Sequence, residues 1–580
     1  MEQALPQYST QESPAPLKRA ADVIIDILIA AKVEVIFGLP GGTIAPVYDA
    51  LLDHPEIRVI TTRHESGAMF AAAAYARATG KLGVVLVTSG PGVLNAITGL
   101  ASAQCDSIPL LLIGGEVSRA VHGKGALQEG SAHHLNVVAM ASHITKLAIE
   151  IPEATAVPAM MRRAIGTALS GRPGPVFVSL PMNVSCKEIA APRFSHSVST
   201  RCVTDPDMVA RAAAILQNGG RQVIFAGSGV RSGNGAACLR ALAERLQCPV
   251  MTTPKGKGVF PEDHPLSLGV YGLGGHLSAQ EYVDNGLDVM LAIGTSLGDL
   301  QTNGWTDKLI PKHELIHVDI DPMRVGRTYA VTLGVAAPLA EFIEALLPLC
   351  VAQAVREKFG VRECASAELS ESRMPDRISP ARALWEIQQV MPADTIYTID
   401  AGDHFIYATH FLNLTAPDSF FCMTGLGSMG ASIGGAIGSK LAAPTRSVAA
   451  ICGDGGFAMV GTEISTAVQA GIPLVVFVLN NGGYGMVENG NKRVYGRTPT
   501  YEVGNVSVSA LAQTLGAQTL VIERPGQLLE RRFNLRRPKQ VWVVEIMTDA
   551  TFKMSANQRF ANLAAIASGQ KGGSNEARQS

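Results

Sequence analysis

The sequence lacks the features that mark several classes of protein. Its 580 residues carry 48 Lys and Arg against 49 Asp and Glu, so it has no basic excess of the kind that binds nucleic acid or anionic membranes. Its nine cysteines form no CxxC pair, which favours reduced thiols over a disulfide framework. No apolar run approaches the ~20 residues of a membrane helix, and the polar first 17 residues lack the apolar stretch of a signal peptide. We therefore expect a cytoplasmic protein with no nucleic-acid or membrane partner.

What the sequence does contain is typical of a compact α/β enzyme. Hydrophobic residues make up 47%, charged residues 17%, and there are 59 glycines. The length predicts several units of ordinary domain size. Shifts in composition place them at 18–190, 205–350 and 378–560, with a flexible tail at 1–17, a polar linker at 351–377 and a disordered tail at 561–580.

The stretch 446–487 predicts a strand–helix–strand unit whose two turns reach the same sheet edge. An apolar run at 447–451 leads into Gly-Asp-Gly-Gly (453–456), and a helix is expected over 457–470. A second apolar run at 474–479 leads into Asn-Asn-Gly-Gly (480–483). Ligands of such units bind beyond the carboxyl ends of the parallel strands.

The residue types at this edge suit a divalent cation and a diphosphate. The Asp454 carboxylate, the Asn481 amide oxygen and the Gly483 carbonyl predict an oxygen-lined Mg²⁺ site, and the glycine amides can donate to phosphates. Either turn alone is more often an ordinary glycine-rich connection. Their occurrence on consecutive strands favours the binding interpretation.

The chain also contains an internal repeat. The order strand, glycine turn, helix, Ile-Pro, strand occurs in 84–115 and again in 447–481, which predicts two related α/β domains. Only the second copy carries Asp454 and Asn481. A third α/β region lies between them, with a glycine turn at 227–229 that fits either a nucleotide site or an empty structural domain.

Taken together, the motifs resemble the thiamine diphosphate (ThDP) enzymes, and most of all the catalytic subunit of acetolactate synthase, over about residues 17–549. This resemblance implies an α/β fold of three doubly wound parallel-sheet domains: pyrimidine-binding, central and diphosphate-binding. The segments that carry it are GLPGG (38–42), RHESGA (63–68), TSGPG (88–92), GRPGP (171–175), GLGSMG (425–430), GDG (453–455) and NN (480–481).

The family's roles can be transferred to the matching positions. The resemblance implies catalytic roles for Glu65, which would promote the imino tautomer of the pyrimidine, for Met429, which would hold ThDP bent, and for Gln128, which would face the reaction centre. It implies Mg²⁺ ligands at Asp454, Asn481 and Gly483. The implied cofactor-binding residues are Gly41, Gly42, Glu65, His404, Gly427, Met429, Gly453, Asp454, Gly455, Gly456, Asn481, Gly483, Tyr484, Gly485 and Met486.

The implied activity is a carboligation: a 2-oxo acid, most simply pyruvate, loses CO₂ and its acyl carbanion adds to a carbonyl acceptor. A homodimer or homotetramer is implied as well. The alternatives are a non-ligating decarboxylase, an acyloin lyase or synthase, and a catalytically silent regulatory protein. Three departures from acetolactate synthases, some of them like benzaldehyde lyase, point to a different acceptor site: SLGDLQT (296–302) replaces an arginine-bearing segment, PMN (181–183) replaces Pro-Lys-Asp, and the tryptophan expected near Met486 is missing. In addition, Asp403 replaces the usual glutamine beside His404. The loss of the arginine-bearing segment, together with the altered turn at 272–276, makes FAD doubtful.

Overall fold

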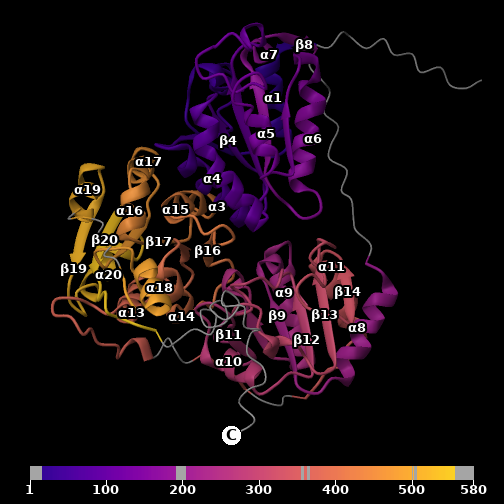
Figure 1. Cartoon of the computed structure of the whole chain (residues 1–580), viewed down its shortest axis with the longest axis vertical. Coiled ribbons are helices and arrows are strands. Elements are labelled where there is room, and N and C mark those ends of the chain that lie inside the picture. The colour runs from indigo at the N-terminus through magenta and orange to yellow at the C-terminus, as the bar shows by residue number, and fades with distance from the viewer. Residues whose placement is uncertain are drawn as a thin grey trace, which may run out of the picture. The chain divides into compact units, whose positions relative to one another are not determined.

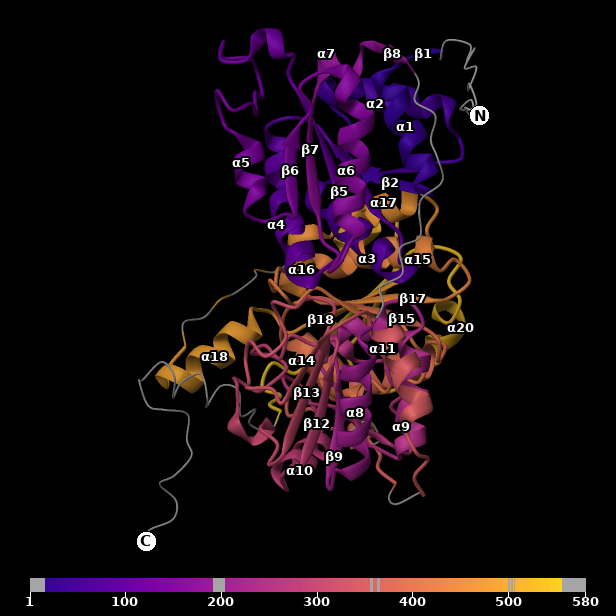
Figure 2. The same ribbon diagram turned by 90° about the vertical axis from the view of Figure 1, so that its right-hand side faces the viewer.

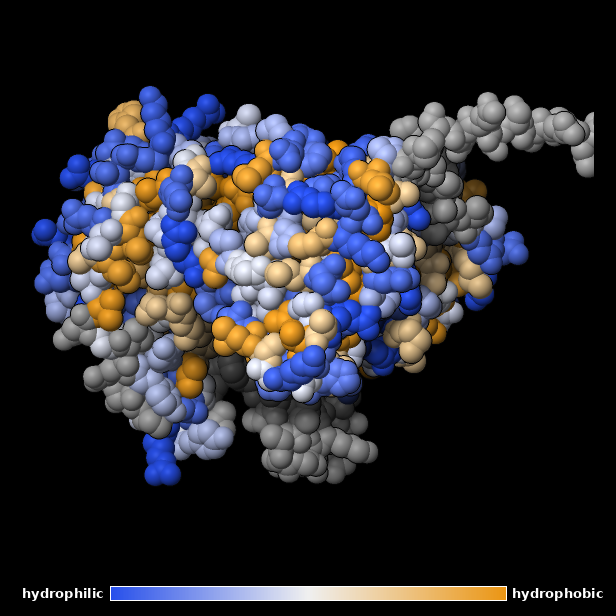
Figure 3. Space-filling view, turned by 90° about the horizontal axis from the view of Figure 1, so that it is seen from above, coloured by the Kyte–Doolittle hydropathy of each residue, from blue (hydrophilic) through white to orange (hydrophobic). Residues whose placement is uncertain are grey.

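The computed structural model describes residues 16–190, 204–354, 358–361, 366–498, 501, 504 and 506–554. Most of the tail expected at 1–17, all of the tail at 561–580 and parts of the linker at 351–377 lie outside these residues. No helix in the described ranges is both long and apolar enough to cross a membrane. On the face shown in Figure 3, hydrophilic residues are interspersed with small groups of hydrophobic ones.

The chain divides into two compact units, the first of which comprises 1–61, 81–104 and 108–199. It holds a six-stranded parallel sheet (Figure 1), whose strands in spatial order are β3 (Arg58–Thr61), β2 (Val35–Gly38), β4 (Gly83–Val87), β5 (Leu110–Glu116), β7 (Val176–Pro181) and β6 (Leu147–Glu150). The helices of this part are α1 (Ala20–Ala30), α2 (Ala45–Ala50), α4 (Pro91–Asp106), α5 (Val137–Ser142), α6 (Val157–Leu169) and α7 (Met182–Ser185). Apolar faces of α1 and α6 pack on the sheet, with Ile24, Leu28 and Met161 fully buried.

The second unit comprises 62–80, 105–107 and 200–580 and contains two six-stranded parallel sheets. The strands of the central sheet are, in spatial order, β11 (Ser267–Val270), β10 (Val250–Thr252), β9 (Gln222–Ala226), β12 (Val289–Ile293), β13 (Glu314–Asp319) and β14 (Leu333–Ala336). Counted along the chain, this is the order 3-2-1-4-5-6 of dinucleotide-binding folds. Its helices are α8 (Pro206–Asn218), α9 (Gly235–Leu246), α10 (Leu277–Asp284) and α11 (Leu339–Leu346).

The C-terminal sheet carries the segments that the sequence singled out. Its strands in spatial order are β16 (Phe420–Cys422), β15 (Ile396–Ile399), β17 (Val448–Gly453), β18 (Val475–Asn480), β20 (Trp542–Met547) and β19 (Gln518–Ile522). Its helices are α13 (Pro380–Val390), α14 (Asp403–Phe411), α15 (Ala431–Ala442), α16 (Asp454–Val460), α17 (Glu463–Gln469), α18 (Gly485–Tyr495), α19 (Val508–Thr514) and α20 (Arg532–Leu535).

The first and C-terminal sheets share one topology. Counted along each domain, the strand order is 2-1-3-4-6-5 in both, whereas the central sheet differs. The three parallel sheets confirm the predicted fold class, and the shared order confirms the internal repeat that the sequence predicts.

Helix α1 begins at Ala20, because Leu17–Arg19 form β1 and pair antiparallel with β8 (Glu188–Ala190). The helix expected over 457–470 is split into α16 and α17 at Gly461, where a Cβ atom would lie 2.6 Å from the Phe457 carbonyl oxygen. Glycine is a poor helix former, so the chain turns there.

Helix α3 (Glu65–Thr79) follows β3 in the sequence but belongs to the second unit, where it lies beside α15 (Figures 1 and 2). Small residues permit this close packing. A Cβ on Gly438 would clash with the Ala71 carbonyl oxygen, and one on Gly434 would lie 2.9 Å from the Gly67 carbonyl oxygen. The alanine- and glycine-rich composition of the two helices therefore has a packing explanation.

Candidate active site

A cavity of about 190 Å³ lies at the carboxyl ends of β15, β17 and β18. The glycine turn after β17 and the Asn-Asn turn after β18 meet here, as their adjacent parallel strands require. Twelve of the predicted cofactor-binding residues line it: His404, Gly427, Met429, Gly453, Asp454, Gly455, Gly456, Asn481, Gly483, Tyr484, Gly485 and Met486.

The Asp454 carboxylate, the Asn481 side-chain amide and the Gly483 carbonyl converge at one side of this cavity. The Asn481 amide can face inward with either atom. With oxygen inward, that atom lies 3.2 Å from Asp454 Oδ1 and 2.8 Å from the Gly483 carbonyl oxygen; with nitrogen inward, it donates hydrogen bonds to both. Octahedral Mg²⁺ with ligands at 2.0–2.1 Å needs neighbouring oxygens about 2.9 Å apart. The oxygen-inward arrangement therefore fits the cation, and the amide can turn to satisfy the same oxygens without it.

The surroundings of the Asp454 carboxylate favour the binding of a cation. Only 6% of the residue is exposed, and burial raises the pKa of its carboxyl to about 6, although backbone N–H groups of Asn481, Gly455 and Gly482 act in the opposite direction. A cation at this position would stabilise the charged form. The described residues contain no cluster of three or more His, Cys, Asp or Glu side chains suited to a metal, so a metal site here depends on amide and carbonyl oxygens.

The glycines around the cavity are required by close packing. A Cβ on Gly455 would lie 2.7 Å from the Tyr484 ring, and one on Gly456 would lie 2.6 Å from Asp400 Oδ2. No side chain larger than hydrogen fits at either position without displacement. The turn therefore leaves backbone N–H groups near the cavity, which is the geometry that phosphate binding uses.

His404 contributes a buried polar atom without a partner. The residue lies in the first turn of α14 and is 7% exposed, and among the described residues its Nε2 has no hydrogen-bond partner. Burial lowers the pKa of His404 to about 4, so the ring is neutral at neutral pH. Because an unpaired buried polar group is costly, this nitrogen indicates a ligand in the cavity.

Asp400, which the sequence analysis missed, fixes the loop that carries Met429. Its carboxylate accepts hydrogen bonds from the backbone N–H of Gly430 at 2.8 Å and of Ala431 at 3.1 Å. Burial raises the pKa of Asp400 to about 6. Gly427 and Gly430 take positive φ values of 78° and 94°, so the loop folds tightly around half-buried Met429. The sequence signal that could have identified Asp400 is an acidic residue directly after a strand that ends at the binding edge.

Glu65 begins α3 and is 5% exposed. It is not among the described residues that line the cavity within one chain. The segment before it is held by Glu463, which accepts hydrogen bonds from the backbone N–H of Arg63 at 3.1 Å and of His64 at 2.9 Å. Burial raises the pKa of Glu463. Sequence reasoning missed this residue as well.

The remaining predicted positions lie in the first unit. Gly41 caps a short turn after β2, where a Cβ atom would lie 2.5 Å from that of Thr88, and Gly42 begins that turn. Gln128 is exposed and takes a positive φ of 63°, packed against Gly90. The proposed contacts of these residues with the cofactor and substrate remain predictions.

The glycine turn of the central sheet has a packing explanation of its own. A Cβ on Gly227 would clash with the Gly294 carbonyl oxygen and lie 2.6 Å from Thr295 Cβ, and one on Gly229 would lie 2.8 Å from the Gly294 Cα. These glycines are therefore required by the neighbouring strand end whether or not a nucleotide binds. The nucleotide-site interpretation gains no support from them.

Comparison with known proteins agrees with this geometry. Residues 18–136, 209–346 and 400–546 match the models of the thiamine pyrophosphate enzyme N-terminal TPP-binding, central and C-terminal TPP-binding domains. The chain is 33% identical to a probable acetolactate synthase large subunit of Methanocaldococcus jannaschii, over 92% of both chains. It is 33% identical to an acetolactate synthase of Mycobacterium bovis, over 88% of this chain and 84% of that one. The chain therefore belongs to the thiamine diphosphate-dependent enzymes, and within that family it is similar to the acetolactate synthases.

Proposed function

We propose that this ThDP-dependent enzyme is an acetolactate synthase-like carboligase. It would decarboxylate a 2-oxo acid, most simply pyruvate, and join the remaining acyl unit to a carbonyl acceptor. The observation that carries the proposal is the convergence of Asp454, Asn481 and Gly483 with Met429 around one cavity. Similarity to relatives named acetolactate synthase over most of the chain supports the carboligase class.

Mg²⁺ would be held by the Asp454 carboxylate, the Asn481 amide oxygen and the Gly483 carbonyl, and would leave positions free for diphosphate oxygens and water. His404 Nε2 would donate or accept a hydrogen bond at the diphosphate, according to its tautomer. Half-buried Met429, held through the Asp400-anchored loop, would support the bent cofactor. When bound, ThDP supplies the carbon nucleophile for cleavage and formation of carbon–carbon bonds.

Glu65 would exchange a proton with the pyrimidine nitrogen, a task suited to a carboxyl group shielded from water. Because Glu65 does not line the cavity of its own chain, we propose that a second copy supplies it. The functional enzyme would then be a homodimer or a homotetramer. Gln128 would face the reacting carbon in that assembly.

The reaction balances without an oxidant. The bond between the carboxylate and the carbonyl carbon breaks, CO₂ leaves, and the electron pair forms the new carbon–carbon bond to the acceptor. The acceptor oxygen then takes up one proton. This chemistry needs no redox cofactor, so FAD is not part of the proposal.

The alternatives differ in what happens to the acyl unit. A non-ligating decarboxylase would release an aldehyde, and an acyloin lyase or synthase would act on molecules without an oxo acid. A silent regulatory protein has no need of Glu65, Asp454 and Asn481 together, and the chain keeps all three. That retention favours catalysis.

Product analysis tests the proposal. Purified protein with ThDP and Mg²⁺ is incubated with ¹³C-labelled pyruvate and a panel of aldehydes and 2-oxo acids, and products are identified by mass spectrometry. We expect labelled CO₂ from C1 and a product that contains the labelled two-carbon unit joined to the acceptor. Labelled acetaldehyde as the sole product would favour simple decarboxylation. No consumption of any 2-oxo acid would contradict the proposal.

A further inference from the structure

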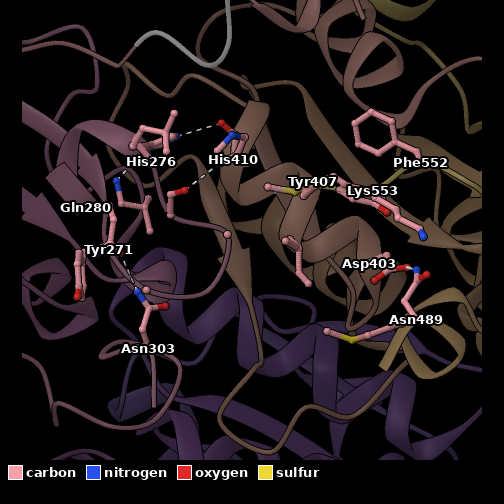
Figure 4. A pocket seen from close by; sticks show the side chains of 18 of the residues that line it. Tyr271, His276, Gln280, Asn303, Asp403, Tyr407, His410, Asn489, Phe552 and Lys553 are labelled. Atoms are coloured by element: carbon pink, nitrogen blue, oxygen red, sulfur yellow. Dashed lines mark hydrogen bonds between the residues drawn. The ribbon is translucent and has the colours of Figure 1, made fainter. Parts of the chain in front are cut away.

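A second and larger cavity, of about 580 Å³, adjoins the candidate cofactor site. One wall comes from the segment after β11 and the start of α10, and the opposite wall comes from α14, α18 and residues 552–554 (Figure 4). Asp403, Tyr407 and Met486 line both cavities. We refer to the larger space as the outer cavity.

His276 and His410 form hydrogen bonds that connect the central-sheet wall with α14. His276 is 1% exposed; its Nδ1 accepts a hydrogen bond from the Val270 N–H at 2.8 Å, and its Nε2 lies 3.0 Å from the His410 carbonyl oxygen. His410 Nδ1 lies 2.9 Å from the Gly275 carbonyl oxygen. Burial lowers the pKa of His276 well below its usual range. His276 is therefore neutral at neutral pH, and the two histidines hold the loop after β11 against α14.

Apolar side chains cover much of the space between the two walls. They are Leu277, Ile406, Tyr407, Met486, Phe552 and Met554. In Figure 4, Tyr407 and Phe552 stand opposite the wall formed by Tyr271, His276 and Gln280. Cavities of about 300–1,000 Å³ with predominantly apolar walls are typical of sites for small organic molecules. The outer cavity is much larger than a three-carbon oxo acid requires.

The charge at the junction of the two cavities restricts what binds there. Asp403 accepts a hydrogen bond from Asn489 Nδ2 at 3.0 Å and forms no ion pair with another described residue. Its carboxylate would repel a second carboxylate held at the junction. Lys492 and Lys553 line the cavity but are exposed. The junction therefore favours a neutral carbonyl group over a second 2-oxo acid.

We infer that the outer cavity binds the carbonyl acceptor, and that this acceptor is an aldehyde with a bulky, mostly apolar body, such as an aryl or long alkyl group. The inference rests on the proposed function and names its acceptor class. The aldehyde carbon would reach the inner cavity past Asp403, Tyr407 and Met486, and the apolar body would remain among the outer side chains. Each buried methylene favours binding, so larger acceptors gain affinity here.

Gly490 offers a selective way to fill the outer cavity. It lies in α18, lines the outer cavity but not the inner one, and a Cβ atom there meets nothing within 4 Å. Gly490→Trp should occupy part of the space. Gly166→Trp is the matched control, because Gly166 is an exposed glycine of α6 with equally open surroundings. Leu277→Trp, on the opposite wall, is a second variant in case Gly490→Trp does not fold.

The kinetic experiment compares two acceptors with pyruvate as donor. For the wild type we expect kcat/KM to be at least tenfold higher with 3-phenylpropanal than with acetaldehyde. Gly490→Trp or Leu277→Trp should reduce this preference at least tenfold, whereas Gly166→Trp should preserve it. Equal use of the two aldehydes by the wild type, or an unchanged preference in both cavity-filling variants, would overturn the inference.

A binding experiment separates this inference from the proposed function. The probe is 3-phenylpropan-1-ol, which has the same body but no carbonyl group and cannot react. Saturation-transfer NMR with the ThDP- and Mg²⁺-loaded protein should show binding to the wild type and to Gly166→Trp, and loss of binding in Gly490→Trp. This result would support the outer cavity even if no 2-oxo acid were consumed. Absence of binding, or a flavin at one equivalent per chain that Gly490→Trp displaces, would overturn the inference.

Discussion

Glu463 Oε1 accepts a hydrogen bond from the backbone N–H of His64 at 2.9 Å, although the two residues are 399 positions apart. This bond fixes the residue directly before Glu65. Glu463 is 1% exposed and also accepts a hydrogen bond from Thr466 Oγ1 at 2.7 Å, so its carboxylate is itself held in place. The position of the proposed proton-transfer group thus depends on a carboxylate of α17 that does not line the cavity.

Glu463→Gln should impair cofactor activation more than cofactor binding. The amide keeps the shape of the side chain but has no negative charge and only one acceptor atom, so it accepts hydrogen bonds from the Arg63 and His64 N–H groups more weakly. We expect exchange of the ThDP C2 proton to slow roughly tenfold, which corresponds to about 1.4 kcal/mol. Ser465→Ala, which removes hydrogen bonds to the Arg63 side chain and to the Thr462 carbonyl oxygen but none to the Arg63 or His64 backbone N–H, is the control. A purely structural role would lower the thermal midpoint and leave the exchange rate unchanged.

Glu65→Gln should abolish most of the activation while ThDP still binds. General acid–base catalysis by a positioned side chain contributes about 10²–10⁴-fold, so C2 exchange should slow by at least 10². Hydrogen–deuterium exchange, followed by acid quench and NMR, measures this rate. Glu153→Gln, at an exposed site, should exchange like the wild type. Wild-type exchange in Glu65→Gln would show that another group activates the cofactor.

The stability of the protein without Mg²⁺ should depend on pH through Asp454. Burial raises the pKa of Asp454 to about 6, so the folded protein holds this proton more tightly than the unfolded chain. Protonated Asp454 stabilises the folded protein fully below about pH 4. This contribution to the free energy of unfolding, roughly 1–3 kcal/mol, is lost as the pH rises through 6. Asp454→Asn should therefore raise the thermal midpoint at pH 7.5 more than at pH 5. Asp207→Asn, on the exposed side of α8, should not. An equal rise of the thermal midpoint at both pH values would show that the pKa of Asp454 is not raised in the folded protein.

The purified protein should be colourless and should need no FAD. The arginine-bearing segment expected beside a flavin is replaced by SLGDLQT (296–302), and the glycines at 227 and 229 are explained by packing on Gly294. Absorbance after gel filtration checks this prediction. A flavin band near one equivalent per chain would contradict it.

The sequence predicts the binding edge because its signals are local. Each apolar strand is followed at once by its glycine turn, and two such turns on adjacent parallel strands must meet. The roles of Asp400 and Glu463 were not predictable in this way, because a single acid after a strand or within a helix is ordinary until its partners are known. The outer cavity could not be predicted for the same reason, since its walls come from five separate segments of the chain.

Calorimetric titration of ThDP in the presence of Mg²⁺ shows whether Asp454 holds the cation. We place Mg²⁺ between Asp454, Asn481 and the Gly483 carbonyl, so removal of the only carboxylate among these ligands should remove Mg²⁺-dependent affinity. The wild type should bind ThDP tightly in Mg²⁺ and weakly in EDTA. Asp454→Ala should stay folded and bind ThDP at least 10²-fold more weakly, with no response to Mg²⁺. An Asp454→Ala protein with wild-type, Mg²⁺-dependent affinity would contradict the account.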